Sequence, residues 1–150
     1  MALRPDRNEV ITDLSFFLNE TAERGLIVVA NTQGSGAAMD DSSAAVKVPS
    51  APGVAGKPVG LLLNDVVNLD LTRQHINYAK DEVQKGSKVL VLRRGTVVTD
   101  QISGSVTMGS AAYFDDTGKL RSGDSGSAQV GRWLSKKDAD GFAKIEINIV

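Results

Sequence analysis

The chain has 150 residues, of which 41% are hydrophobic and 23% are charged, and its formal net charge is −1. This length fits one domain that can bury roughly 70% of its unfolded surface. The balanced charge gives no reason to expect nucleic acid as a partner, which would require a basic stripe. There is no cysteine, so disulfides and thiolate zinc sites are excluded. The longest apolar run, Leu26–Ala30, is too short to span a membrane.

The first residues are polar and carry Pro5. We expect residues 1–13 to form a flexible N-terminal arm, because they have little to bury. Residues 14–150 would then be a single β-rich domain. On this interpretation, deleting the arm leaves the domain folded.

Two apolar runs follow, Leu14–Leu18 and Leu26–Ala30. The second is rich in β-branched residues, which predicts a strand. A helix from Leu14 to Arg24 is the alternative for the first run, although Asn19 and Thr21 weaken it.

Residues 31–60 are dominated by Gly, Ala, Ser and Pro and contain no aromatic residue. Such a stretch cannot bury enough apolar surface to order itself alone, so we expect a long loop. One short strand at Val46–Val48 is compatible with it. Residues 60–71 are apolar again, and residues 70–85 fit irregular or extended structure better than a helix.

From Lys88 onward the chain reads as short strands separated by turns. Ala143, Ile145, Ile147 and Ile149 alternate with polar residues, which is typical of a strand with one buried face. This spacing predicts a mainly β fold, either a barrel or a sandwich. The expected segments are a strand Lys88–Leu92, a turn at Arg94-Gly95, a return strand Thr96–Thr99, a strand Ala111–Phe114, a turn Asp115–Gly118, a strand Ala128–Leu134 and a turn Asp138–Gly141.

Little in the sequence suggests catalysis. Gly123-Asp124-Ser125-Gly126 resembles the nucleophile motif of serine proteases, and His75 lies upstream. A serine hydrolase using Ser125 is therefore an alternative, but the motif lies in a polar, glycine-rich stretch typical of an ordinary loop. The acidic pairs Asp40-Asp41 and Asp115-Asp116 lack the spacing of a calcium loop. We expect no enzyme activity, no cofactor and no metal.

Other residues suggest contact surfaces or core. Arg73, His75 and Tyr78 form a polar and aromatic cluster of the kind enriched at interfaces, and we assign them to a subunit interface. Trp133, the only tryptophan, lies in an apolar run and is expected in the core. A small-ligand-binding β-module is a further alternative.

The closing block resembles capsid decoration proteins of tailed bacteriophages, also called cement or head-stabilising proteins. The resemblance covers about residues 60–150 and rests on five short pieces: Lys85–Val89, Arg94–Val98, Met108–Phe114, Thr117–Leu120 and Val130–Leu134. The alternative of a ligand-binding β-module would also belong to a phage particle.

The resemblance implies a structural virion protein on the outer surface of the capsid, built as a small β-barrel or β-tulip-like domain. It would act as a homotrimer that clamps neighbouring subunits of the major capsid protein and stabilises the expanded shell. The N-terminal arm would bind the capsid, and its segment Val10–Thr12 could add a strand to a neighbouring sheet. The assigned capsid-binding residues are Leu3, Arg4, Pro5, Arg7, Val10 and Ile11.

Overall fold

The computed structural model describes residues 3, 4, 6–31, 45–49, 57–63, 82–83, 88–123 and 128–149. Every regular element in these ranges is a β-strand, so the mainly β prediction is confirmed. The strands are β1 (Asn8–Leu18), β2 (Ala22–Glu23), β3 (Ile27–Asn31), β4 (Ala45–Lys47), β5 (Pro58–Leu63), β6 (Glu82–Val83), β7 (Lys88–Thr99), β8 (Ala111–Phe114), β9 (Leu120–Arg121), β10 (Gly131–Trp133) and β11 (Ala143–Asn148).

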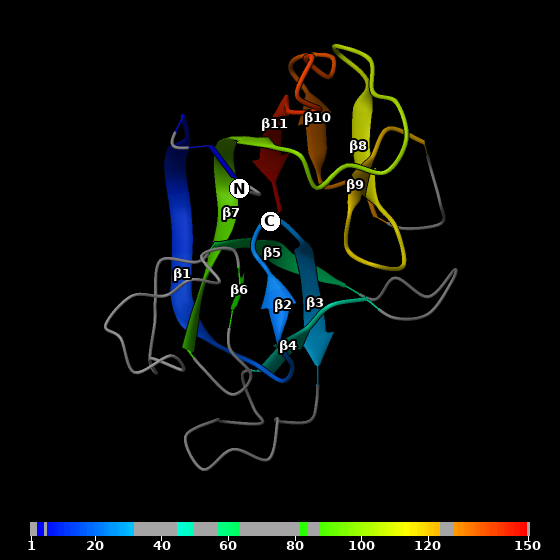
Figure 1. Ribbon diagram of the computed structural model, residues 1–150. Helices are drawn as coiled ribbons and strands as arrows, with labels where there is room; N and C mark the ends of the chain where they lie inside the picture. Colours follow the sequence, from blue (N-terminus) through cyan, green and yellow to red (C-terminus); the bar gives the residue numbers. More distant parts are fainter. Residues whose placement is uncertain are drawn as a thin grey trace, which may run out of the picture.

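Five strands close into a ring. Their pairing runs β1-β4-β3-β5-β7 and returns from β7 to β1. The long strand β7 also begins a second group, β7-β11-β10-β8-β9, which extends away from the ring (Figure 1). This five-strand ring corresponds to the expected small barrel or tulip-like core.

Strand β7 belongs to both groups because of its length. It pairs with β1 along one edge. Along the other edge it pairs with β5 over Leu90–Leu92 and with β11 over Arg94–Thr99. A single strand therefore fixes the ring and the second group relative to each other.

A compact apolar cluster joins the strands of the ring. Each of the five strands supplies a fully buried side chain, namely Leu18 from β1, Val28 from β3, Val46 from β4, Leu62 from β5 and Val91 from β7. Side chains alternate between the two faces of a strand, and this cluster is formed by the side chains on one face of the ring's strands.

The other faces of β3, β5 and β7 point into a second, larger cluster. Ile27 and Leu61 lie there, packed with Phe114, Trp133 and Ile145 from the second group. Strands β3 and β5 are therefore buried on both sides. Because both faces of these strands are buried, their sequences are continuous apolar runs and do not alternate between apolar and polar residues.

Local predictions for the second group are largely confirmed. In β11 the residues Ala143, Ile145 and Ile147 are buried, whereas the residues between them are exposed. Trp133 is fully buried, as expected. The strand expected over Ala128–Leu134 is shorter in the structure, where β10 spans Gly131–Trp133.

Both aspartate turns are confirmed by their hydrogen bonds. Asp115 Oδ1 accepts from the backbone N–H groups of Thr117 and Lys119, at 2.9 and 3.0 Å. Asp138 Oδ1 accepts from those of Asp140 and Phe142, both at 2.9 Å. These carboxylates stabilise the turns by replacing backbone partners.

The hairpin predicted at Arg94-Gly95 is wrong. Strand β7 continues through these residues for 12 residues in all. Gly95 has a φ of +153°, and a Cβ at this position would lie 2.2 Å from the backbone oxygen of Asn8. The glycine therefore permits the close approach of β1 rather than a reversal of the chain.

Two of the open alternatives are decided as strands. Leu14–Leu18 lies in β1, so the alternative of a helix up to Arg24 is wrong. The short strand expected at Val46–Val48 is present as β4, one residue earlier.

The described part of residues 1–13 is hydrogen-bonded to β7. Leu3 is 1% exposed and bridges to Thr99, and the Arg4 N–H donates to the carbonyl of Val98 at 3.0 Å. Antiparallel pairing resumes at Asn8 opposite Thr96. Residues 3, 4 and 8–13 therefore lie along β7, and we no longer expect deletion of residues 1–13 to be neutral for folding.

Candidate functional site

One edge of β1 has no strand partner among the residues that the structure describes. Strand β7 occupies the opposite edge from Asn8 to Phe17. Strand β4 reaches only the end of β1, at Phe17 and Leu18. We call the unpaired edge over residues 8–16 the β1 edge. It lies at one side of the molecule in Figure 1.

The β1 edge carries exposed apolar side chains. Val10 is 59% exposed, Ile11 is 49% exposed and Leu14 is 45% exposed. Three such residues on a strand with one edge free of described partners are unusual, because sheet edges are normally protected by charge, proline or a cover. Apolar groups gathered on an edge indicate a contact surface.

Three irregularities interrupt the β1–β7 register, and in two of them β1 has the extra residue. Between the pairs Glu9↔Gly95 and Ile11↔Arg94, Val10 is an extra residue on β1. Between Asp13↔Val91 and Phe16↔Val89, β1 again has one residue more than β7. An extra residue of this kind bends the strand and redirects a side chain. The irregular register thus accounts for the outward placement of Val10 and Leu14.

Polar contacts hold the second irregular segment in shape. Both the N–H and the hydroxyl of Ser15 donate to Asp13 Oδ1. The hydroxyl bond, followed by the backbone bond, holds the pKa of Asp13 below its ordinary value of 3.8. The carboxylate is therefore the form that fixes this segment.

Two of the predicted capsid-binding residues are engaged within the domain. Leu3 lies in the larger core cluster, and its carbonyl accepts from Arg24 at 3.1 Å. Arg4 forms ion pairs of 3.2 Å with Asp138 and 3.4 Å with Asp140. Neither side chain is available as a flexible anchor.

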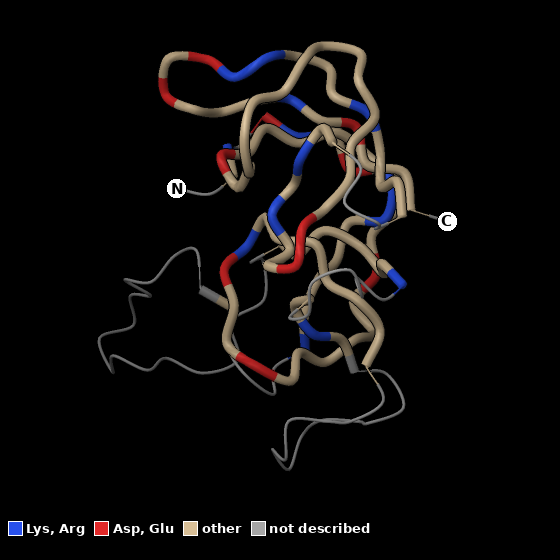
Figure 2. The backbone as a smooth tube through the Cα atoms, turned by 90° about the vertical axis from the view of Figure 1, so that its right-hand side faces the viewer, with Lys and Arg blue, Asp and Glu red and all other residues tan. Residues whose placement is uncertain are grey.

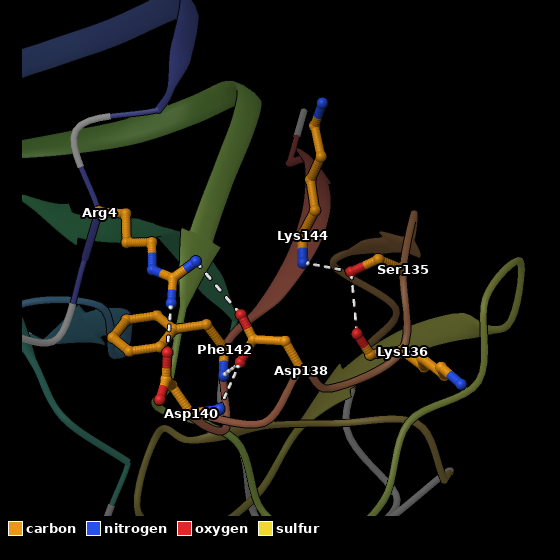
Figure 3. Close-up of polar contacts among 7 residues, drawn as sticks. All are labelled: Arg4, Ser135, Lys136, Asp138, Asp140, Phe142 and Lys144. Atoms are coloured by element: carbon orange, nitrogen blue, oxygen red, sulfur yellow. Dashed lines mark hydrogen bonds and ion pairs between the residues drawn. The ribbon is translucent and has the colours of Figure 1, made fainter.

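Figure 3 shows how Arg4 is held. Its guanidinium lies 4.2 Å from the centre of the Phe142 ring and reaches the two aspartates of the β10–β11 turn. The N–H of Phe142, more than any other contact, lowers the pKa of Asp138, and Arg4 adds to the effect. This cluster attaches the start of the chain to the second group of strands.

The remaining predicted site residues divide into two sets. Arg7 forms an ion pair of 2.7 Å with Glu9 near the start of β1. Pro5 lies outside the described residues. The predicted subunit-interface residues Arg73, His75 and Tyr78 also lie outside them, as does Ser125 of the serine hydrolase alternative.

The exposed position of Leu14 was not predicted from the sequence. It stands at the start of the run Leu14–Leu18, which suggests core, yet only Leu18 of that run is buried. A signal was present, because Ser15 interrupts the run and makes a regular buried strand less suitable.

A groove also lies on the exposed face of β10 and β11, with a volume of about 450 Å³. It is lined by Gln129, Gly131, Arg132, Glu146 and Asn148. Composition alone gave no indication of it, because these residues come together only through the pairing of the two strands.

Within the described ranges, no three His, Cys, Asp or Glu residues are grouped so that they could hold a metal ion. The same part of the chain contains no helix that is long and apolar enough to cross a membrane.

Comparison with known proteins identifies the family. A search of curated proteins found no match. The family model described as "Structural cement protein (E217 gp24/Pam3 gp6)", a phage cement family, matches residues 11–148. The match begins within β1 and includes the whole of β11. The chain therefore belongs to the structural cement protein family of phages and is a virion protein of the outer capsid surface.

Proposed function

We propose that this cement protein clamps neighbouring subunits of the major capsid protein by offering the β1 edge to an extended segment of a capsid subunit. The observation that supports it is a strand edge that pairs with no other described strand over residues 8–16 and bears Val10, Ile11 and Leu14. Added strands bind through main-chain hydrogen bonds, and pockets or side chains at alternate positions supply specificity.

The β1 edge suits this task because it is already ordered. A disordered arm loses about 1–2 kcal/mol of backbone entropy for each residue that it fixes on binding. Strand β1 is held by β7 before the partner arrives, so most of that cost falls on folding. The irregular register at Val10 and near Leu14 also discourages pairing with an arbitrary strand.

The contact with the capsid is therefore reassigned to Val10 and Ile11, with Leu14 added. Leu3 and Arg4 act indirectly, by fixing the start of β1 to the domain. Arg7 would help through its ion pair with Glu9, although exposed pairs contribute little, typically 0–1 kcal/mol.

The clamp would work as a homotrimer, as the resemblance to decoration proteins implies. Three copies of one weak contact bind with much higher avidity than a single copy. Arg73, His75 and Tyr78 remain our candidates for the subunit interface. Light scattering on the wild type and on a Tyr78→Ala variant tests this, with loss of the trimer expected for the variant.

The proposed role requires no catalysis, since clamping depends on adhesion alone. A fluorophosphonate probe tests the serine hydrolase alternative. Labelling that disappears in a Ser125→Ala variant would contradict a purely structural role.

Substitution at the β1 edge tests the clamp itself. A Val10→Asp/Ile11→Asp variant places two charges where an apolar contact is proposed, and we expect at least tenfold weaker binding to expanded capsids. Met108→Asp is the control for an added surface charge, because Met108 is 72% exposed and lies in the loop between β7 and β8. Equal binding by both variants would contradict the proposal.

A further inference from the structure

The exposed face of the second group of strands can be read from the register. Residues paired across two strands point to the same face. Arg94 pairs with Asn148 and Arg132 pairs with Glu146. Lys144 alternates with Glu146 along β11 and is exposed like it. These residues therefore share one face, which also includes Ile11 of β1 because Ile11 pairs with Arg94.

The same reasoning extends to the far strands. Arg132 pairs with Ala111 of β8, which shares its face with Tyr113, and Tyr113 pairs with Arg121. The face thus carries the cations Arg94, Arg121, Arg132 and Lys144, but Glu146 is the one carboxylate that the register assigns to it. We call these residues the basic face.

No described residue forms an ion pair with any of these four cations; the ion pairs present are made by Arg4 and Arg7. Even Glu146, which lies directly opposite Arg132 in the ladder, forms no ion pair with it. Figure 2 shows Lys and Arg positions on several separate segments of the chain, with Asp and Glu positions among them. The basic face is therefore an unbalanced cluster of positive charge on a chain whose net charge is −1.

The groove of β10 and β11 opens on this face and contains both kinds of polar group. Arg132 supplies a guanidinium, which can hold a carboxylate with two parallel hydrogen bonds. Glu146 supplies an acceptor for an N–H donor. The amide nitrogen of Gln129 is already engaged, since it donates to the Gly131 carbonyl at 3.2 Å. The groove thus fits a ligand that combines an anion with a hydrogen-bond donor.

We propose that the basic face binds an acidic, extended polypeptide segment, with one carboxylate of that segment on Arg132 and a backbone N–H on Glu146. A polyanion that lacks donors fits less well, because Glu146 would repel it. The inference rests on the proposed function in one respect, since it takes the segment to belong to a capsid subunit. It names the charge of that partner surface, which is continuous with the β1 edge through Ile11.

The test compares binding to expanded capsids that lack this protein. Arg132→Glu should weaken binding at least tenfold, and its loss should shrink as salt is raised, because screening reduces the wild-type attraction. Lys119→Glu is the control with the same change in charge, at an exposed residue in the β8–β9 turn. Fluorescence of Trp133, which lies next to Arg132, establishes that each variant is folded.

The outcomes separate the two proposals. If Arg132→Glu binds like Lys119→Glu while the Val10→Asp/Ile11→Asp variant loses binding, the basic face has no acidic partner and the clamp stands. If none of the variants loses binding, both proposals fail. Heparin binding that matches capsid binding and is lost equally in Arg132→Glu would show a general polyanion site and overturn the assignment of a polypeptide.

Discussion

Replacing Leu3 with alanine tests whether the start of the chain belongs to the folded domain. Leu3 is 1% exposed and packs in the larger core cluster. The substitution removes three carbon atoms at about 0.8 kcal/mol each and leaves a cavity that costs more. We expect the free energy of unfolding to fall by about 3 kcal/mol, and Tm by about 6–12 °C for a domain of this size.

The assay is urea unfolding followed by the fluorescence of Trp133, the only tryptophan and fully buried. Leu14→Ala is the matched control, because it makes the same change at a side chain that is 45% exposed. A surface change of this kind usually alters stability by no more than about 0.5 kcal/mol. Equal stability of the Leu3→Ala and Leu14→Ala proteins would refute the docking of the N-terminal segment.

Two further predictions concern the second group of strands. Gly131→Ala should lower the free energy of unfolding by about 3 kcal/mol or more, because the added Cβ would lie 1.8 Å from the backbone oxygen of Glu146. The control Gly104→Ala, at a position with open space and a φ of +82°, should lower it by only about 1–2 kcal/mol. Similar urea midpoints for the two variants would contradict the close approach of β10 and β11. Asp138 has a pKa lowered from 3.8, so its contribution to stability is present above that value and is lost as the pH falls through the lower pKa of the folded state. The urea midpoint of wild type should therefore exceed that of Asp138→Asn at pH 6 and approach it near pH 2, and a constant difference would show that the Asp138 carboxylate is not responsible.

Features set by neighbouring residues were predictable from the sequence. The alternation of Ala143–Ile149 marks a strand with one buried face, and the aspartate turns depend on hydrogen bonds within four residues. Mainly β architecture follows from these signals. Each of them requires only local chain geometry, which sequence patterns report directly.

Features that depend on distant residues were not predictable in the same way. Gly95 looks like a turn residue, and only the nearby Asn8 carbonyl explains why glycine is needed inside a strand. The first residues look like a free arm because the side chains of β1 from Asn8 to Asp13 are mostly polar and exposed. Backbone pairing with β7 orders it without an apolar pattern.

The candidate site was predicted only where its residues could be recognised from their neighbours in the sequence. Val10 and Ile11 stand out as apolar residues in a polar segment. Leu3 and Arg4 looked equally free, but their partners lie about a hundred residues or more away in the chain, at Thr99 and in the β10–β11 turn. The groove beside Arg132 needed the strand register as well.

Hydrogen–deuterium exchange on free and capsid-bound protein measures the central claim most directly, because an added strand protects backbone amides along the edge that it joins. The account predicts slower exchange in residues 8–16 once the protein is bound to expanded capsids. Peptides from β5, which is paired on both edges, serve as the internal reference and should change little. Unchanged exchange in residues 8–16 together with new protection elsewhere on the domain would contradict it.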